Sequence, residues 1–177
     1  MPMHETRDAG NGAQCAIRAC LPGDAAALAE LYRRSVGHFG PRAYSPAQVA
    51  AWAGGISAEK IAACCGDGRH VAVAVAPDDT LLGWGDLEQD GHVDFLYCAP
   101  EAEGRRVGSA LYDTLETHAR AAGMARLYVE ASELARHLFE RRGFLLLRRN
   151  ELIVNGVAIH NFSMEKWLTA TRGECAG

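Results

Sequence analysis

A strand, a charged turn and the start of a helix follow one another in the segment VDFLYCAPEAEGRRVGSAL, Val93 to Leu111. The first amides of a helix have no partner within that helix, and its N-terminus carries partial positive charge, so this arrangement favours an anion site. Gly104 and Gly108 allow the backbone to approach a ligand closely. Arg105 and Arg106 add charge suited to a pyrophosphate. Taken alone, the segment fits a tight structural connection equally well.

The elements that must position this segment are indicated by periodicity and by capping residues. A strand is predicted over Cys15 to Ala19, and a helix follows Asp24, its predicted N-cap. Ser45, Pro46 and Gln48 occupy the N-cap, first-turn and capping-box positions of a second helix. A third, short helix is predicted to end near residue 66.

Three antiparallel strands are predicted next, because turn sequences separate three apolar runs at Val71 to Ala76, Leu81 to Leu87 and Val93 to Cys98. A helix then begins near Gly108 and ends at Gly123, a residue suited to the C-cap region.

A short strand is predicted over Leu127 to Glu130, followed by a helix capped by Ser132 and by a hairpin that turns at Asn155-Gly156. The order of elements predicts an α/β fold with a mixed, mostly antiparallel sheet of six or seven strands flanked by about four helices. We expect one domain over residues 15–168, with loose tails at 1–14 and 169–177.

Composition narrows the classes of function. The formal net charge is -4, from 22 acidic and 18 basic residues, and no long basic run occurs, so we expect no nucleic-acid partner. No run of 18 apolar residues predicts a membrane span. The cysteines lack C-x-x-C spacing, and His38, His92 and His160 form no metal triad by spacing. We therefore expect a cytoplasmic protein without a metal or a membrane partner.

Three segments resemble successive core segments of the GNAT superfamily of N-acetyltransferases. They are the run from Asp94 to Leu111, VEASELARHLFERRGF from Val129 to Phe144, and the closing NGVAIHNFSMEK. The order of elements also matches, and the resemblance is closest to the branch whose second helical segment reads like YSPAQVAAWA. It implies the GNAT fold, with the sheet splayed between strands four and five, and acetyl transfer from acetyl-CoA to an amine.

The resemblance also implies where acetyl-CoA binds. The superfamily's Q/R-x-x-G-x-G/A motif, whose amides hold the CoA pyrophosphate, falls on Glu103 to Gly108, with Glu103 in place of Gln or Arg and Arg106 in place of the first glycine. Ser132 falls where many members carry an Asn that touches the cofactor arm, and Phe139 where many carry a Tyr that protonates the thiolate. Pantetheine pairs with the exposed backbone of strand four. The predicted cofactor-binding positions are thus Leu96, Tyr97, Cys98, Glu103, Gly104, Arg105, Arg106, Val107, Gly108, Ser109, Ala110, Ser132 and Phe139.

Aminolysis of a thioester sets its own requirements. An alkyl amine with a pKa near roughly 10 is mostly protonated at neutral pH, so a base or a desolvating pocket must expose its lone pair. We predict Asp94 as that base, acting through water, with an ion pair to an arginine as the alternative. Ser132 is predicted to donate a hydrogen bond to the thiol sulfur, although a helix N-cap alone would account for it.

Aromatic walls suit an amine-bearing ligand, so Tyr44, Trp52 and Trp84 are predicted to line the acceptor pocket together with Asp86, a reserve base. Core packing is the alternative for Trp52.

The sequence therefore predicts direct acetyl transfer to a primary amine, small molecule or peptide, within a ternary complex, without a covalent enzyme intermediate. The departures from the motif leave a second interpretation, a catalytically degenerate module of the same fold that binds acyl-CoA. Another acyl-CoA donor and a homodimer also stay open.

Overall fold

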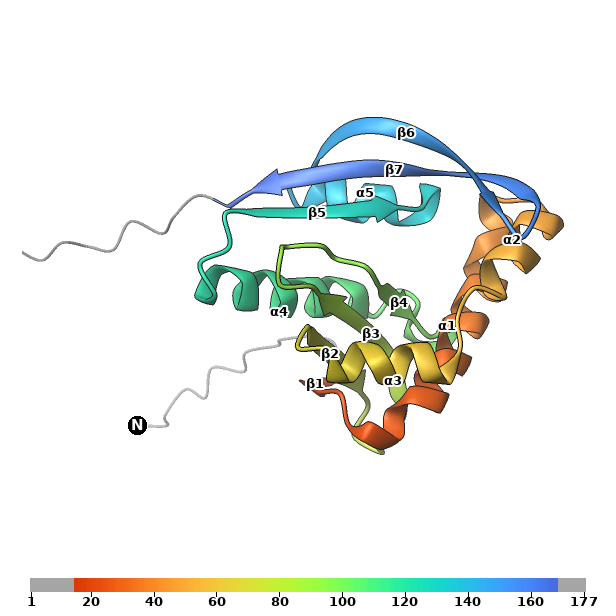
Figure 1. Cartoon of the computed structure of the whole chain (residues 1–177). Helices are drawn as coiled ribbons and strands as arrows, with labels where there is room; N and C mark the ends of the chain where they lie inside the picture. The colour runs from red at the N-terminus through yellow and green to blue at the C-terminus, as the bar shows by residue number, and fades with distance from the viewer. Residues whose placement is uncertain (1–14, 169–177) are drawn as a thin grey trace, which may run out of the picture.

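Two antiparallel sheets form the centre of the computed structural model, which describes residues 15–168 (Figure 1). The first sheet has the order β1-β2-β3-β4, and the second has the order β5-β7-β6. The strands are β1 (Ala16–Ala19), β2 (His70–Val75), β3 (Leu81–Leu87), β4 (Leu96–Cys98), β5 (Arg126–Ala131), β6 (Leu145–Val154) and β7 (Val157–Trp167).

Helices cover both faces of the first sheet. These are α1 (Ala25–Phe39) and α3 (Ala58–Gly66) on one face and α4 (Val107–Ala121) on the other, whereas α2 (Pro46–Ala53) and α5 (Glu133–Arg141) contact β7 of the second sheet. In β2, Val71 and Val73 pack in one core with α1 and α3, whereas Ala72 and Ala74 pack in the other core with α4 and α5. This alternation follows from the two-residue period of a strand, so β2 and β3 are covered on both sides.

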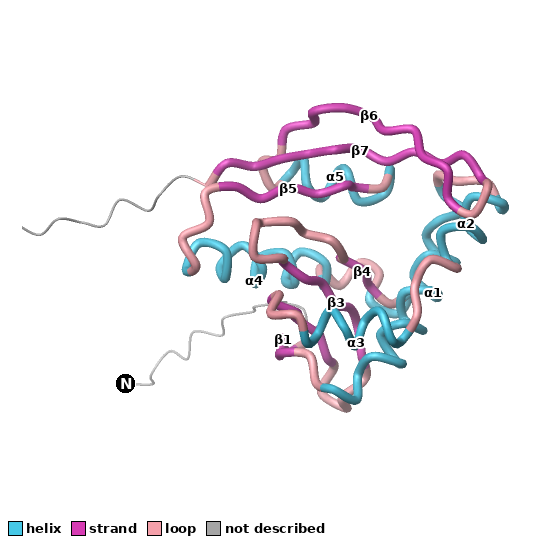
Figure 2. The backbone as a smooth tube through the Cα atoms, viewed as in Figure 1, coloured by secondary structure: helices cyan, strands magenta, loops and turns pink. Residues whose placement is uncertain are grey.

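The two sheets meet at one end and separate at the other. The Val93 amide donates to the Tyr128 carbonyl at 2.9 Å, and the Tyr128 amide donates to the Gly91 carbonyl at 3.0 Å. Gly91 has a φ of 94°, and a Cβ there would lie 2.1 Å from the Arg126 carbonyl oxygen. Figure 2 shows the chain running beside β5 and then turning away from it as β4. The predicted opening between strands four and five is therefore confirmed.

The helix α2 holds the tip of the β6-β7 hairpin. Asn155 donates from Nδ2 to the Ala51 carbonyl at 3.1 Å, and Gln48 donates from Nε2 to the Ala158 carbonyl at 2.9 Å. The predicted turn is confirmed, because Asn155 and Gly156 have φ angles of 50° and 80°. The hairpin thereby closes one side of the opening between the sheets (Figure 1).

One local prediction, the start of the fourth strand, was wrong. The fourth strand begins at Leu96 rather than Val93, because the Asp86 carboxylate accepts the Phe95 amide at 2.8 Å and interrupts the ladder. Asp24 is the N-cap residue of α1, as predicted, but its carboxylate binds Arg18 at 2.6 Å instead of a helix amide.

The predicted α/β class is confirmed, with five α-helices within residues 15–168 rather than about four. The predicted tails, 1–14 and 169–177, lie outside the described residues. None of the described helices is long and apolar enough to cross a membrane.

Candidate active site

A cavity of about 290 Å³ lies in the opening between the sheets. Its walls come from β4 and the residues before it, from the end of β5 and the start of α5, and from α1, α2 and the β6-β7 hairpin. Seven residues predicted for the site line it: Tyr44, Trp52, Asp94, Leu96, Tyr97, Ser132 and Phe139. The fold therefore brings four predicted cofactor-binding residues together with Tyr44, Trp52 and Asp94, whereas Cys98 and residues 103–110 do not line this cavity.

Among residues 15–168, nothing forms a hydrogen bond with the backbone groups on the edge of β4 that faces the cavity. The register with β3, and the hydrogen bonds of Phe95 and Ala99 to β3, turn the main chain of Tyr97 toward β3. The alternation of a strand then directs the amides and carbonyls of Leu96 and Cys98 toward β5. The main chain of Tyr97 thus differs from the prediction, while its side chain lines the cavity.

The N-terminus of α4 has the amides expected of an anion site. Within residues 15–168, no acceptor takes the amides of Val107, Gly108 or Ser109, and the first intrahelical bond runs from Ala110 to Arg106. Gly108 lies against the end of β4, since a Cβ there would be 3.4 Å from the Cys98 sulfur. The helix N-terminus and the open edge of β4 are therefore neighbours.

Both departures from the family motif have a structural explanation. Glu103 accepts two hydrogen bonds from Arg42, at 2.6 and 3.0 Å, and contacts His38 at 3.2 Å. Arg42, and next His38, lower the pKa of the Glu103 carboxyl to about 2, so its negative charge is balanced within the protein. Arg106 has a φ of 57°, so it adopts the left-handed conformation that a glycine would supply, at about 1 kcal/mol of strain.

Ser132 and Phe139 both come from the region of α5. The Ser132 hydroxyl accepts the Ala135 amide at 3.1 Å, which confirms the predicted N-cap. Phe139 is buried and packs edge-on against Tyr112 and Phe144. Its ring presents no proton donor to the cavity.

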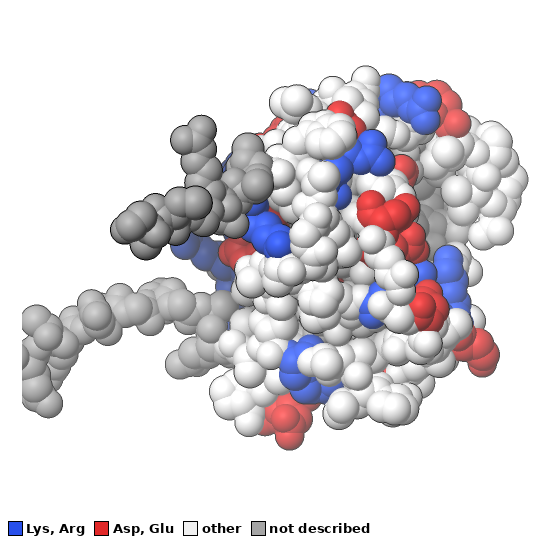
Figure 3. All heavy atoms as spheres, turned by 60° about the vertical axis from the view of Figure 1, so that its left-hand side comes forward, with Lys and Arg blue, Asp and Glu red and all other residues white. Residues whose placement is uncertain are grey.

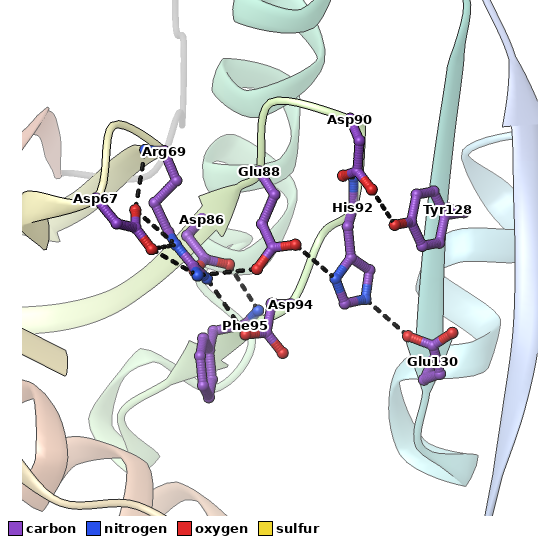
Figure 4. Close-up of polar contacts among 10 residues, drawn as sticks. All are labelled: Asp67, Arg69, Asp86, Glu88, Asp90, His92, Asp94, Phe95, Tyr128 and Glu130. Carbon is purple, nitrogen blue, oxygen red and sulfur yellow. Dashed lines mark hydrogen bonds and ion pairs between the residues drawn. The ribbon is translucent and has the colours of Figure 1, made fainter. Parts of the chain in front are cut away.

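Asp94 belongs to a group of carboxylates gathered around Arg69 (Figure 4). The guanidinium contacts Asp67, Asp86 and Glu88 at 2.8 Å each and Asp94 at 3.3 Å. Burial raises the pKa of Asp86 to about 6, against the opposing effect of its bond to Arg69. The structure therefore shows the ion pair that the sequence left open for Asp94, and it also places Asp94 on the cavity wall.

His92 extends this group toward β5. Its Nδ1 contacts Glu88 at 3.3 Å and its Nε2 contacts Glu130 at 2.7 Å, while the ring stacks on Tyr128 (Figure 4). Although burial lowers it, the pKa of His92 is raised by its bond to Glu130. Glu130 also lines the cavity, which adds a second carboxylate to the Asp94 side.

Trp84 and Asp86, which were predicted for the acceptor pocket, do not line this cavity. Both side chains are completely buried. Trp84 stacks on Phe95 in the core, and Asp86 holds the Phe95 amide. These two residues support Phe95, which lines the cavity.

Tyr44 and Trp52 form an aromatic wall, as predicted, with ring centroids 5.4 Å apart. The Tyr44 hydroxyl accepts the Glu133 amide at 2.8 Å and donates to the His160 carbonyl at 3.2 Å. Trp52 donates from Nε1 to the Tyr97 hydroxyl at 3.3 Å. Sequence reasoning missed Lys60, Glu130 and the pairing of His160 with Glu133, because no local pattern marks residues that only the tertiary fold brings together.

Cys98 does not present a nucleophile. The half-buried Cys98 lies against Gly108 of α4, and desolvation raises the pKa of its thiol to about 12, so the thiolate is scarce at neutral pH. Among the described residues, no group of three His, Cys, Asp or Glu side chains is arranged to hold a metal ion.

Comparisons with known proteins agree with this geometry. The family model of the acetyltransferase (GNAT) domain matches residues 41–166. The chain belongs to the GNAT acetyltransferase family. It is 30% identical over 151 residues to the uncharacterized N-acetyltransferase YafP of Escherichia coli (strain K12), covering 84% of this chain and 93% of YafP. The protein is therefore an acyl-CoA-dependent N-acyltransferase.

Solved structures confirm the fold. A GCN5-related N-acetyltransferase from Rhodopseudomonas palustris, also described as a class-II aminotransferase, is 35% identical with a TM-score of 0.77, covering 86% of this chain and 95% of that one. The PaiA N-acetyltransferase of Thermoplasma acidophilum, solved in complex with coenzyme A, is 21% identical with a TM-score of 0.71, covering 87% of this chain and 99% of that one.

Proposed function

We propose that this GNAT protein moves an acetyl group from acetyl-CoA to a primary amine by direct attack within a ternary complex. The observation that carries the proposal is the single cavity that joins the open edge of β4 to the aromatic wall of Tyr44 and Trp52. A donor on one side and an acceptor on the other would meet there without a covalent enzyme intermediate.

The donor side fits acetyl-CoA. The free amides at the start of α4 and the charge of Arg106 suit the pyrophosphate. The backbone of Leu96 and Cys98 suits the amides of the pantetheine arm, which would pair like an added strand. The Leu96 amide faces the same gap and would donate to the thioester oxygen as it gains negative charge. A thiolate with a pKa near roughly 8.5 needs only modest help to leave, so the Ser132 hydroxyl can take the place of a tyrosine.

The acceptor side favours a cation. Asp94 and Glu130 line the cavity, and the carboxylate of Asp94 lies 3.3 Å from the Arg69 guanidinium. Two carboxylates on one wall of the cavity attract an ammonium group, and the carboxylate of Asp94 is already engaged in an ion pair. We therefore assign Asp94 to binding the acceptor, and the aromatic wall favours an amine on a short apolar or aromatic arm. The view in Figure 3 shows acidic and basic side chains interspersed over the face it displays, which suits a small acceptor better than a nucleic acid.

Release of free thiol from acetyl-CoA tests this function, with phenethylamine, spermidine, lysine and a peptide with a free N-terminus as acceptors. We expect amine-dependent release with the wild-type protein and a KM for the amine that rises at least about tenfold in Asp94→Asn. Asp113→Asn, which removes a carboxylate from a surface ion pair with Arg142, is the matched control. Acetyl-CoA binding without thiol release from any of these amines would favour the alternative function, a degenerate acyl-CoA-binding module.

Further parts of the proposal rest on separate observations. A series of acyl-CoA chain lengths would define the donor, since the cavity is small. A cytoplasmic location accords with the free thiols of the described cysteines.

A homodimer is proposed through β6, the edge strand of its sheet, which exposes Leu145, Leu147 and Ile153. An exposed apolar edge of this length favours pairing with a second copy.

A further inference from the structure

His160 and Glu133 form a hydrogen-bonded pair at the cavity. The His160 Nε2 and a Glu133 carboxylate oxygen are 2.9 Å apart, and the His160 side chain is 16% exposed. His160 comes from β7 and Glu133 from the first turn of α5, directly after Ser132. The pair therefore lies between the aromatic wall and the predicted cofactor arm.

The surrounding residues fix the orientation of the imidazole. The ring of His160 lies 5.3 Å from the ring of Tyr44 and 5.7 Å from the ring of Phe162. The Tyr44 hydroxyl binds the main chain of both His160 and Glu133. Within the described part of the chain, nothing forms a hydrogen bond with Nδ1 of His160, and the residue lines the cavity.

This arrangement prepares one ring nitrogen to accept a proton. A carboxylate that accepts from Nε2 keeps the proton there, so the lone pair of a neutral imidazole is on Nδ1. An imidazole changes charge between about pH 5 and 8, which suits a base at neutral pH. Asp94, on the Arg69 side of the cavity, is instead engaged in an ion pair with that guanidinium at 3.3 Å.

Charged and titratable groups approach the pair from several elements. Arg136 on α5 lies 3.9 Å from Glu133, which leaves the carboxylate mainly to His160. Glu151 on β6 faces His160 across the ladder and is paired with Arg149 at 2.8 Å. Tyr44 adds a phenol, with its pKa raised by burial. Asp94, Glu130 and Lys60 line the same cavity.

We propose that His160, oriented by Glu133, is the general base that removes a proton from the acceptor amine; this inference rests on the proposed acetyl transfer. One ammonium proton passes to Nδ1 and then to solvent. The freed lone pair forms the C–N bond at the thioester carbon, and the C–S bond breaks with its electron pair on sulfur. The second proton lost from nitrogen ends on the sulfur as the thiol. Glu133 is a positioning residue in this step.

The test compares His160→Gln and Glu133→Gln with His137→Gln. His137 is the matched control, because it pairs with Glu140 on the exposed face of α5 at 3.0 Å. The readouts are kcat/KM across pH 6 to 10, for whichever amine of the four-member panel the wild-type protein uses best, and calorimetric binding of acetyl-CoA.

We expect His160→Gln to lower kcat/KM at pH 7 by about 100-fold or more, with the deficit shrinking as pH approaches the pKa of the amine. We expect Glu133→Gln to lower it about tenfold and to move the pH midpoint. Both variants should bind acetyl-CoA as the wild type does, and His137→Gln should match the wild type throughout.

A pH profile of His160→Gln that is parallel to the wild type, or activity equal to that of His137→Gln, would overturn the inference while leaving acetyl transfer intact. If His160→Gln does not fold, an unchanged pH profile in Glu133→Gln overturns it equally. Absence of thiol release by the wild-type protein with all four amines would remove the proposed function itself, and this inference with it.

Discussion

Replacement of Arg69 by methionine tests how the Asp94 wall is held. The Arg69 side chain is 12% exposed and contacts the fully buried Asp86 at 2.8 Å. Removing one partner of a buried ion pair costs about 3 to 5 kcal/mol, and the small exposure of Arg69 places this change near the lower end, about 3 kcal/mol. For a domain of this size we expect Tm to fall by about 6 to 12 °C at pH 7.

The pH dependence of this loss follows from Asp86. The pKa of Asp86 is raised from 3.8 to about 6 by folding. Its titration therefore adds to the free energy of unfolding below pH 3.8, and this addition is lost as pH rises through about 6. Arg69 opposes this rise, and the pKa of Asp86 should therefore climb further in Arg69→Met. The stability difference between the two proteins should then grow from pH 5 to pH 8.

Thermal unfolding followed by circular dichroism at pH 5, 7 and 8 measures this difference. Arg149→Met is the matched control, because Arg149 forms an exposed ion pair with Glu151, worth at most about 1 kcal/mol. An Arg69→Met protein as stable as the control, or a deficit that does not change with pH, would refute the reasoning.

Three further predictions concern the sheet junction, the cap of α5 and the edge of β6. Gly91→Ala should lower the free energy of unfolding, measured by chemical denaturation, by about 2 to 4 kcal/mol, because the added Cβ would clash with a carbonyl of β5. Gly123→Ala, with open space around it, should lower it by about 1 kcal/mol. Equal losses would contradict the assigned junction. Ser132→Ala and Ser57→Ala each remove a helix N-cap, so each should lower the free energy of unfolding by about 1 kcal/mol. Only Ser132→Ala should also lower kcat. Equal kcat values in the two variants would show that Ser132 acts only as a helix cap. Ile153→Lys should convert a dimer to a monomer in analytical ultracentrifugation, and a wild-type protein that sediments as a monomer would exclude the β6 interface.

Local signals in the sequence predicted much of the fold. Ser45 forms the predicted capping box with Gln48, and Asn155-Gly156 forms the predicted turn. Ser132 caps α5, and Gly143 follows that helix with a φ of 85°. Each of these features depends on residues close together in the chain, so their spacing alone is sufficient.

The parts that failed depend on distant residues. The carboxylate of Asp86 captures the Phe95 amide and shortens β4, although 86 and 95 read as parts of two regular strands. Trp84 has the residue type of a pocket wall, but the stacking of its ring on Phe95 buries it. Arg69 belongs to no sequence motif, yet its guanidinium forms ion pairs with four carboxylates.

Calorimetric titration with acetyl-CoA is the most direct test of the central claim, that the start of α4 and the open edge of β4 bind this donor. The titration uses the wild-type protein, Arg106→Ala and, as a surface control, Arg149→Ala. We predict micromolar binding to the wild type and to the control, and binding weaker by about tenfold or more in Arg106→Ala, as expected for loss of a charged hydrogen bond. No binding to the wild-type protein, or equal affinities in all three, would contradict the assigned site.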